Sequence, residues 1–182
     1  PVDRYGIMQS LVKLIKSIKS ISHNGGITMS SRFKTAEVRF SYAQQLYEAK
    51  PNDRGDMKFG VTLLIPKTDA VTYKAFCDAA ETIKRAKVPG KDDAFYKAHP
   101  RTLHDGDGTK PTTGENYGPE CKGCWVVACG SNERPGILSL DPTFNPQADR
   151  INSGDFGKAS LNAFWFDTGT NKGVTFGLNN VL

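Results

Sequence analysis

The segment Asp155–Val181 reads DFGKASLNAFWFDTGTNKGVTFGLNNV and carries the clearest structural signal in the chain. Residues 158–166 are rich in apolar and aromatic side chains, residues 169–173 read GTNKG, and residues 174–178 alternate Val, Phe and Leu with Thr and Gly. Gly and Asn tolerate the positive φ that a tight reversal requires. The segment therefore predicts a β-hairpin, with which strands from the rest of the chain pair.

Upstream of this hairpin, the hydrophobic pattern predicts strands and one long helix. Residues 38–42 alternate with a period of two, and residues 58–66 (KFGVTLLIP) form a mostly buried strand that proline ends. Residues 101–103, 124–129 and 137–140 suit shorter strands. Thr68 and Asp69 mark a helix start, and residues 71–87 suit a helix with one apolar stripe. That predicted stripe contains Val71, Ala75, Ala79, Ile83 and Ala86.

The order of these elements favours a mainly β fold with one long helix. Because strands and helices do not alternate as in βαβ units, an OB-type antiparallel barrel is the leading arrangement. A length of 182 residues with 38% hydrophobic content suits one domain. We assign that domain to residues 32–182 and treat residues 1–31 as a leader.

The leader predicts a short basic amphipathic helix. Its apolar positions recur at helical spacing, with three lysines between them: Leu11, Leu14, Ile15, Ile18 and Ile21. Such a helix binds a membrane surface or a partner, or reaches for phosphates. The alternative is an appended segment that docks on the domain, since Asn24-Gly25-Gly26 breaks the chain and Met29 resembles a native start.

Charge and cysteine content restrict the function classes. The formal charge is +5, but the leader holds four basic residues and one acidic residue, so the other 20 basic and 18 acidic residues nearly balance. Nucleic-acid binding therefore needs a local cluster of cations. Four cysteines are too few for a disulfide scaffold, and no apolar run reaches the roughly 18 residues that span a bilayer. We expect a soluble cytosolic protein with no membrane partner.

Five segments resemble one known family. VRFSYA (38–43), KFGVTLLIPK (58–67), LHDGDG (103–108), ERPGI (133–137) and GTNKGVTFGLNNV (169–181) are similar, in order and spacing, to phage-encoded single-stranded DNA-binding proteins with an OB barrel, long classified as a domain of unknown function. The resemblance runs from about Phe33 to the end of the chain. The leader lies outside it, and the chain stops at Leu182 without the acidic tail that such proteins often carry.

The resemblance implies a non-catalytic protein that coats exposed single strands, without reading their sequence, during phage replication and recombination. It implies action in the cytoplasm of the infected host, no cofactor, and phage replication proteins as further partners. Single-strand binding needs cations along the phosphates and rings on which bases stack. The candidates for these roles are Arg39, Tyr47, Lys58, Arg134, Lys158, Trp165 and Lys172. For each ring the alternative is a place in the core, and for each cation a solvated strand end.

Metal binding and catalysis are less favoured interpretations. His99, His104, Cys121 and Cys124 have ligand types that suit zinc, although a chain of this size needs no metal to fold, and the alternative is four ordinary residues with reduced thiols. A metal-dependent nuclease or hydrolase around His104 to Asp107 is the catalytic alternative, but Asp-Gly repeats are common turn chemistry. A structural or adaptor protein acting through the leader is a third alternative.

The sequence leaves several questions open. Residues 161–166 and 124–129 are apolar on both parities, so the inward face of these strands is undefined. The oligomeric state, including a homo-oligomer, and the preference for DNA over RNA are open as well.

Overall fold

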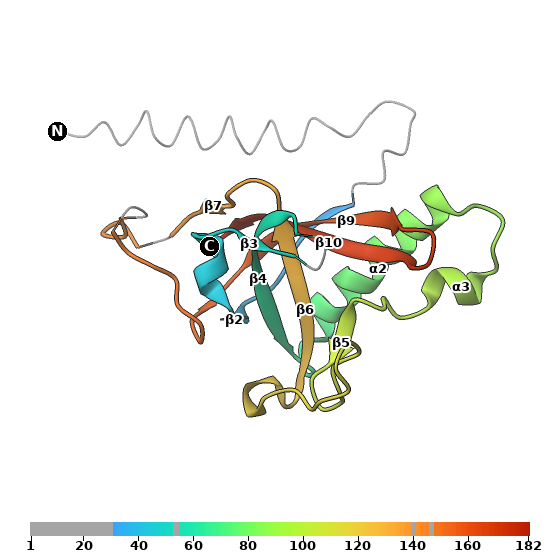
Figure 1. Ribbon diagram of the computed structural model, residues 1–182, viewed down its shortest axis with the longest axis horizontal. Coiled ribbons are helices and arrows are strands. Elements are labelled where there is room, and N and C mark those ends of the chain that lie inside the picture. The colour runs from blue at the N-terminus through green and yellow to red at the C-terminus, as the bar shows by residue number, and fades with distance from the viewer. Residues whose placement is uncertain (1–30, 53–54, 140, 146–147) are drawn as a thin grey trace.

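The computed structural model describes residues 31–52, 55–139, 141–145 and 148–182, so the helix predicted in the leader lies outside the described residues. The fold is mainly β, with one ten-stranded sheet and one long helix (Figure 1). The helices are η1 (Ala43–Leu46), α2 (Ala70–Lys87), α3 (Asp93–Lys97) and η2 (Pro119–Cys121). The strands are β1 (Arg32–Lys34), β2 (Val38–Ser41), β3 (Lys50–Pro51), β4 (Met57–Pro66), β5 (Leu103–Asp105), β6 (Cys124–Ser131), β7 (Gly136–Ile137), β8 (Phe156–Gly157), β9 (Ala159–Asp167) and β10 (Lys172–Val181). No helix among the described residues is long and apolar enough to cross a bilayer.

The predicted hairpin is confirmed as β9 and β10. Their antiparallel register runs from Lys172 opposite Asp167 to Val181 opposite Ala159, with a bulge near Leu178. Gly169 takes the positive φ of 81° that its turn requires. Strand β10 begins inside the predicted turn, because the reversal needs only residues 168–171, where Thr168 accepts and donates hydrogen bonds with Asn171.

The prediction of a wholly antiparallel sheet is wrong. The strand order is β1-β9-β10-β6-β4-β2-β8, and β10 pairs with both β6 and β7 in parallel. The long connection from β7 to β8 brings the hairpin back to the sheet with β10 running in the direction of β6. Only Lys158 separates β8, which pairs with β2, from β9, which pairs with β10. The sheet therefore curls back towards itself as an OB-like half-barrel.

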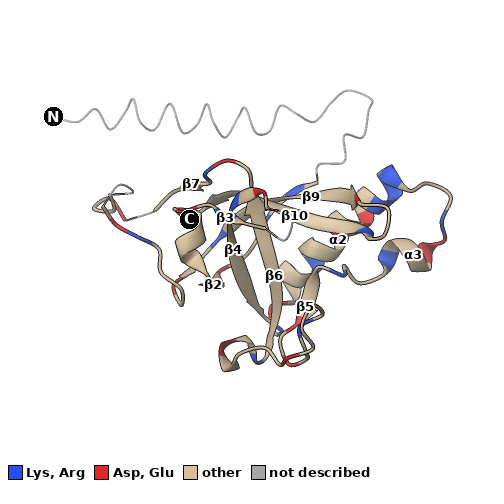
Figure 2. Ribbon diagram, viewed as in Figure 1, with Lys and Arg blue, Asp and Glu red and all other residues tan. Residues whose placement is uncertain are grey.

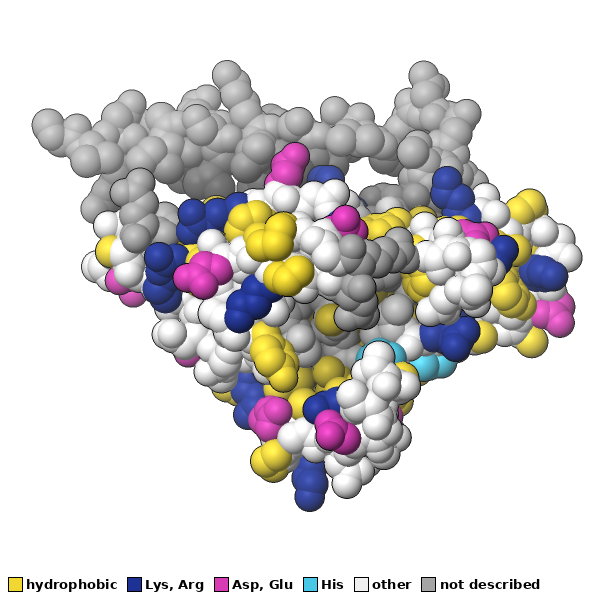
Figure 3. All heavy atoms as spheres, in the orientation of Figure 1, with side chains coloured by type: hydrophobic (Ala, Val, Ile, Leu, Met, Phe, Trp, Pro, Cys, Tyr) yellow, Lys and Arg dark blue, Asp and Glu magenta, His cyan; other side chains and the backbone are white. Residues whose placement is uncertain are grey.

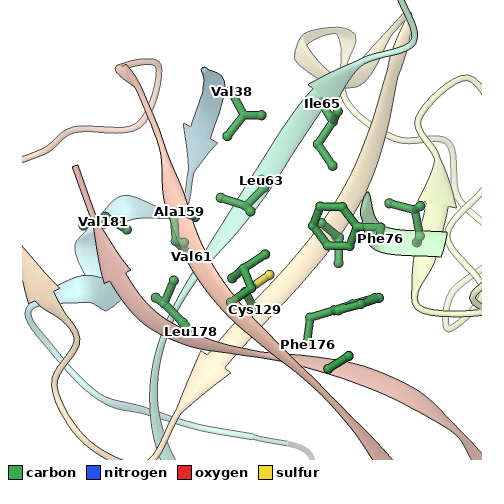
Figure 4. Packing of buried hydrophobic residues seen from close by; sticks show 14 of the residues in the cluster. Val38, Val61, Leu63, Ile65, Phe76, Cys129, Ala159, Phe176, Leu178 and Val181 are labelled. Carbon is green, nitrogen blue, oxygen red and sulfur yellow. The ribbon is translucent and has the colours of Figure 1, made fainter. Parts of the chain in front are cut away.

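The core fills the space between the curled sheet and α2 (Figure 4). Asp69 caps α2, as predicted, by accepting a 2.9 Å hydrogen bond from the Thr72 N–H. The buried stripe of the helix is rotated from the predicted one and contains Thr72, Phe76, Ala79, Ala80 and Lys84. Val71 is 78% exposed. The stripe follows Phe76, the largest apolar side chain of the helix, whose ring meets Phe176 of β10 at 4.6 Å between centroids.

The structure settles which parity of β9 and β6 faces inward. Leu161 and Ala163 on β9, and Val127 and Cys129 on β6, are buried in the core. Their neighbours face the outer side of the sheet. At one end of β4 and β6 this outer side is covered by a second apolar cluster of Leu64, Cys121 and Val126, with Tyr117 and Cys124 packed against it. The loop from β5 to β6 thus covers one end of the outer face and leaves the other end open.

Candidate nucleic-acid interface

The uncovered outer face of β6, β9 and β10 carries an open groove of about 800 Å³. We call it the β9/β10 groove. Its lining includes Asn52, Asp56, Lys58, Thr102, Gly130, Ser131, Asn132, Glu133, Asn162, Phe164, Phe166, Thr175, Gly177 and Asn179. Strands supply the floor, whereas the β3–β4 and β6–β7 connections supply one side. The floor is therefore fixed by the sheet ladder, which makes it a rigid surface on which to hold a ligand.

Two of the three phenylalanines that line this groove face outward, and the third, Phe176, is buried in the core. Phe164 and Phe166 stand two residues apart on β9 and thus point to the same outer face. Phe164 is 46% exposed, an unusual position for a phenylalanine. Each ring leans on a glycine of β10: a Cβ at Gly177 would stand 2.8 Å from Phe164 Cε1, and one at Gly173 would stand 3.2 Å from Phe166 Cε1. Because these two glycines have no side chain, both rings can lie close to β10.

Gly177→Ala tests this arrangement of the rings. The added methyl group would meet Phe164 Cε1 at 2.8 Å, and the ring must tilt away. We expect binding to oligo-dT to weaken by about 3- to 10-fold, a fraction of the roughly 1–3 kcal/mol of one stacked base. Alanine suits a strand interior at least as well as glycine, so the free energy of unfolding should fall little. Fluorescence anisotropy and urea unfolding measure the two effects, and unchanged affinity would contradict a role for the Phe164 ring position.

Hydrogen-bond donors accompany the rings. Asn162 Nδ2 donates to Asn179 Oδ1 at 3.1 Å, and Arg32 Nε donates to Asn162 Oδ1 at 3.2 Å. Asn179 Nδ2 is buried and has no hydrogen-bond partner among the described residues. Lys58 Nζ donates to Asn132 Oδ1 at the groove side. Asn162 thus links Arg32 to Asn179 on the outer face, and the Lys58 side chain is held at the groove side.

Three of the seven residues proposed from the sequence come together at the end of the barrel where β4 begins and β6 ends. Lys58 lines the groove, and its partner Asn132 lies two residues before Arg134. The Arg134 guanidinium lies over the Tyr47 ring, 5.5 Å from its centroid. Arg150, which the sequence analysis missed, lies over the same ring at 4.2 Å. The sequence around Arg150 does not mark it as a binding residue, because Arg150 lies in a long irregular loop.

The other four candidates lie elsewhere. Trp165 has the inward parity of β9 and packs against the core cluster, opposite to Phe164 and Phe166. Lys172 forms a 2.8 Å ion pair with Asp167 at the hairpin tip, and this hydrogen bond lowers the pKa of the Asp167 carboxyl. The structure thus places both residues outside the groove lining.

Arg39 and Lys158 are also separate from the groove. Arg39 donates to the backbone oxygen of Glu120 on the outer side of β2. Lys158 is exposed between β8 and β9, and its backbone N–H donates to Leu182 O at 2.7 Å. Lys and Arg side chains are spread over the visible face with acidic groups between them (Figure 3), and the ribbon view also shows blue segments near both ends of the molecule (Figure 2). The visible face therefore carries mixed charge rather than one continuous cationic surface.

The residues considered for zinc and catalysis have protein partners. Cys121 and Cys124 belong to the second apolar cluster, where burial raises the pKa of both thiols. His99 bonds to Leu103 O at 2.5 Å and to the Tyr73 hydroxyl at 3.1 Å. His104 is half-buried on β5, and burial lowers its pKa. Across the described residues, no three His, Cys, Asp or Glu side chains are grouped to hold a metal ion.

The acidic stretch after His104 forms a braced turn. Lys67 Nζ lies 2.6 Å from Asp105 Oδ1 and 2.7 Å from Asp107 Oδ2, and these hydrogen bonds lower the pKa of both carboxyls. Asp107 Oδ1 also accepts the Gly123 N–H at 2.9 Å. Both carboxylates are thus engaged in positioning the loop from β5 to β6, as the turn interpretation of the Asp-Gly repeat predicted.

Comparisons with known proteins place the chain in a family. A family described as "Enterobacter phage Enc34, ssDNA-binding protein" matches residues 31–182. The structure is similar to that of the single-stranded DNA-binding protein from bacteriophage Enc34 in complex with ssDNA, with 25% identity, a TM-score of 0.66, and coverage of 84% of this chain and 85% of that chain. A second structure of the Enc34 protein gives 26% identity and a TM-score of 0.60 over 84% and 79% of the chains. No curated protein sequence matches the chain. The family match covers all of the described fold and confirms the resemblance seen in the sequence: the chain belongs to the phage single-stranded DNA-binding family of the Enterobacter phage Enc34 protein.

Proposed function

We propose that this protein binds single-stranded DNA in the β9/β10 groove, without reading its sequence and without catalysing a reaction on it. The observation that carries the proposal is the pair of outward rings, Phe164 and Phe166, in a groove on an OB-like sheet. A relative at 25% identity is a single-stranded DNA-binding protein solved in complex with ssDNA. The site and the family thus point to the same ligand.

The chemistry of the groove suits unpaired bases. Every base has a π face, so stacking on phenylalanine holds single strands with little dependence on sequence. In a duplex the bases stack on one another, and these rings would find no free face. Lys58 supplies a cation at the groove side. The groove thus favours single strands over duplex.

Membership of the family supports a setting for this activity. We take residues 32–182 as the binding domain with an OB-type barrel, acting in the cytoplasm of the infected host during phage replication and recombination. The paired carboxylates of Asp105 and Asp107 support a non-catalytic role, because a nuclease of this kind needs acidic groups available for a metal. Contact with other replication proteins and with further copies of the chain also belongs to this proposal.

A titration of oligo-dT against a duplex of equal length tests the proposal. We expect tight binding of the single strand, weaker binding of the duplex, and a linear fall of log K with log salt, with a slope of about −0.7 for each phosphate contacted. Fluorescence anisotropy at several salt concentrations between about 50 and 200 mM gives both quantities. Equal affinity for duplex would contradict the proposed site. Cleavage of the labelled strand in the presence of Mg²⁺ or Mn²⁺ would contradict the non-catalytic role.

A further inference from the structure

Two arginines from different loops converge on one tyrosine ring. Arg134, between β6 and β7, lies 5.5 Å from the centroid of Tyr47, and Arg150, between β7 and β8, lies 4.2 Å from it. The ring itself is held in place: its hydroxyl accepts the Ile151 N–H at 2.7 Å, and its body packs against the core cluster. A fixed ring therefore orients two guanidinium groups that belong to separate segments.

Neither guanidinium is neutralised by the described part of the protein. Arg134 and Arg150 form no ion pair among the described residues, and both are exposed. The fold contains an instructive contrast in Arg85, which also lies over a tyrosine ring, that of Tyr96, at 4.4 Å. Arg85 is paired with Glu81 at 2.7 Å and with Asp93 at 2.8 Å. Two like charges beside one ring repel each other, and a bound anion removes that repulsion.

A cleft of about 250 Å³ lies beside this ring and is lined by Gln44, Tyr47, Glu48, Arg150, Ile151, Asn152 and Ser153. Arg150 lines the cleft, whereas Arg134 lies over the ring outside this lining. A guanidinium that stacks on a ring keeps its N–H donors at its edge, where they can grip a phosphate through two parallel hydrogen bonds. Glu48 is the one carboxylate of the lining, and its negative charge repels a bound anion. Removing this charge is therefore expected to strengthen anion binding.

The loop that carries Arg134 runs from the β9/β10 groove to the Tyr47 ring. Ser131, Asn132 and Glu133 line the groove, and Arg134, the next residue in the chain, lies over the ring. A strand whose bases stack on Phe164 and Phe166 and that leaves the groove past Lys58 and Asn132 would therefore approach the two arginines. The group that such a strand presents all along its length is the backbone phosphate, which makes DNA phosphate the ligand we assign to them.

We infer that Tyr47, Arg134 and Arg150 form a phosphate clamp, separate from the groove, which holds the backbone of the same DNA strand beyond the stacked bases. This inference rests on the proposed function and extends its footprint. It assigns a binding role to Arg150. It also gives Tyr47 a positioning role, in which the ring holds guanidinium groups rather than stacking on a base.

The test uses the full chain, the double variant R134A/R150A, and R85A as a control with the same residue type and ring geometry but a paired charge. With long oligo-dT we expect the slope of log K against log salt to become shallower by about 1.4 in the double variant, or about 0.7 for each phosphate that the variant no longer binds. The slope should stay unchanged in R85A. With the shortest oligo-dT that the wild-type protein still binds, the double variant should match the wild type, because only the groove is filled. Glu48→Gln should tighten binding of the long strand.

The outcomes separate the two proposals. Wild-type binding together with an unchanged slope in R134A/R150A overturns the clamp alone. An equal loss on short and long strands overturns its separation from the groove. Absence of wild-type binding to any oligo-dT overturns the proposed function and the clamp with it. Thermal unfolding of each variant confirms that the fold is retained, as the exposure of both arginines leads us to expect.

Discussion

Replacing Phe164 and Phe166 together with alanine is expected to weaken binding to oligo-dT by at least about 30-fold. Each ring that stacks a base contributes roughly 1–3 kcal/mol, so two rings contribute roughly 2–6 kcal/mol, and each 1.4 kcal/mol is about tenfold in affinity. Both rings are on the outer parity of β9, and neither belongs to the core cluster, so the variant should fold. Anisotropy titrations with the single and double variants measure the loss.

The control for this experiment is Phe156→Ala. Phe156 on β8 is also an exposed phenylalanine, at 64%, but it lines a different hollow beside Leu182. Its removal should leave the affinity for oligo-dT unchanged. If the double variant bound as tightly as the wild type, base stacking in the β9/β10 groove would be wrong, even if the protein bound single strands elsewhere. The slope of log K against log salt should be the same in the wild type, the Phe164/Phe166 double variant and Phe156→Ala, because a phenylalanine side chain neutralises no phosphate charge.

Phe76→Ala is expected to have the largest effect on stability. The Phe76 side chain is fully buried, with an exposed fraction of 0%, and lies in the core near Phe176 (Figure 4). The centroid of its ring is 4.8 Å from that of Phe33 and 4.6 Å from that of Phe176. Removing a buried phenylalanine ring costs about 3–5 kcal/mol, because apolar transfer is lost and a cavity remains. That is a large share of the roughly 5–15 kcal/mol that stabilises a domain. Urea unfolding followed by circular dichroism measures it.

The exposed Phe156 again supplies the matched control. Its replacement by alanine should change the free energy of unfolding by less than about 0.5 kcal/mol, as is usual for surface positions. A loss in Phe76→Ala no greater than in Phe156→Ala would contradict the packing of α2 on the sheet. At low temperature, the folded fraction of Phe76→Ala should still bind oligo-dT, because Phe76 faces the core rather than the groove. The two phenylalanine experiments thus separate stability from binding.

Local sequence patterns predicted the helices and strands better than they predicted which face of each one is buried. The hairpin of β9 and β10 followed from Gly169 and the alternation after it, and α2 followed from the cap at Asp69. The predicted apolar stripe of α2 was right at Ala79 and Ile83 and wrong at Val71, which is exposed. Val71 and Ala75 fit the helical period as well as Thr72 and Phe76 do. Side-chain size decided between them, since the space beside Phe176 is filled by an aromatic ring. Periodicity alone does not contain that choice.

The candidate site shows the same division. Lys58, Arg134 and Tyr47 were chosen as cations and a ring near strand ends, and they do gather at one end of the barrel. Phe164 and Phe166 were passed over in favour of Trp165, because residues 161–166 are apolar on both parities. A signal was nonetheless present: the glycines at positions 173 and 177 of β10 leave room for rings across the ladder. Arg150 had no such signal.

The hairpin, the long helix, the mainly β class and the family could all be predicted from the amino-acid sequence, because they depend on contacts between near neighbours and on the order of motifs along the chain. Three features became visible only in the folded chain: β10 runs parallel to β6, β9 turns Phe164 rather than Trp165 outward, and two distant loops meet over Tyr47. Parity and strand direction become fixed only when the sheet curls and one face is buried. Apolar residues on both sides of a strand leave that choice to the packing of the whole chain.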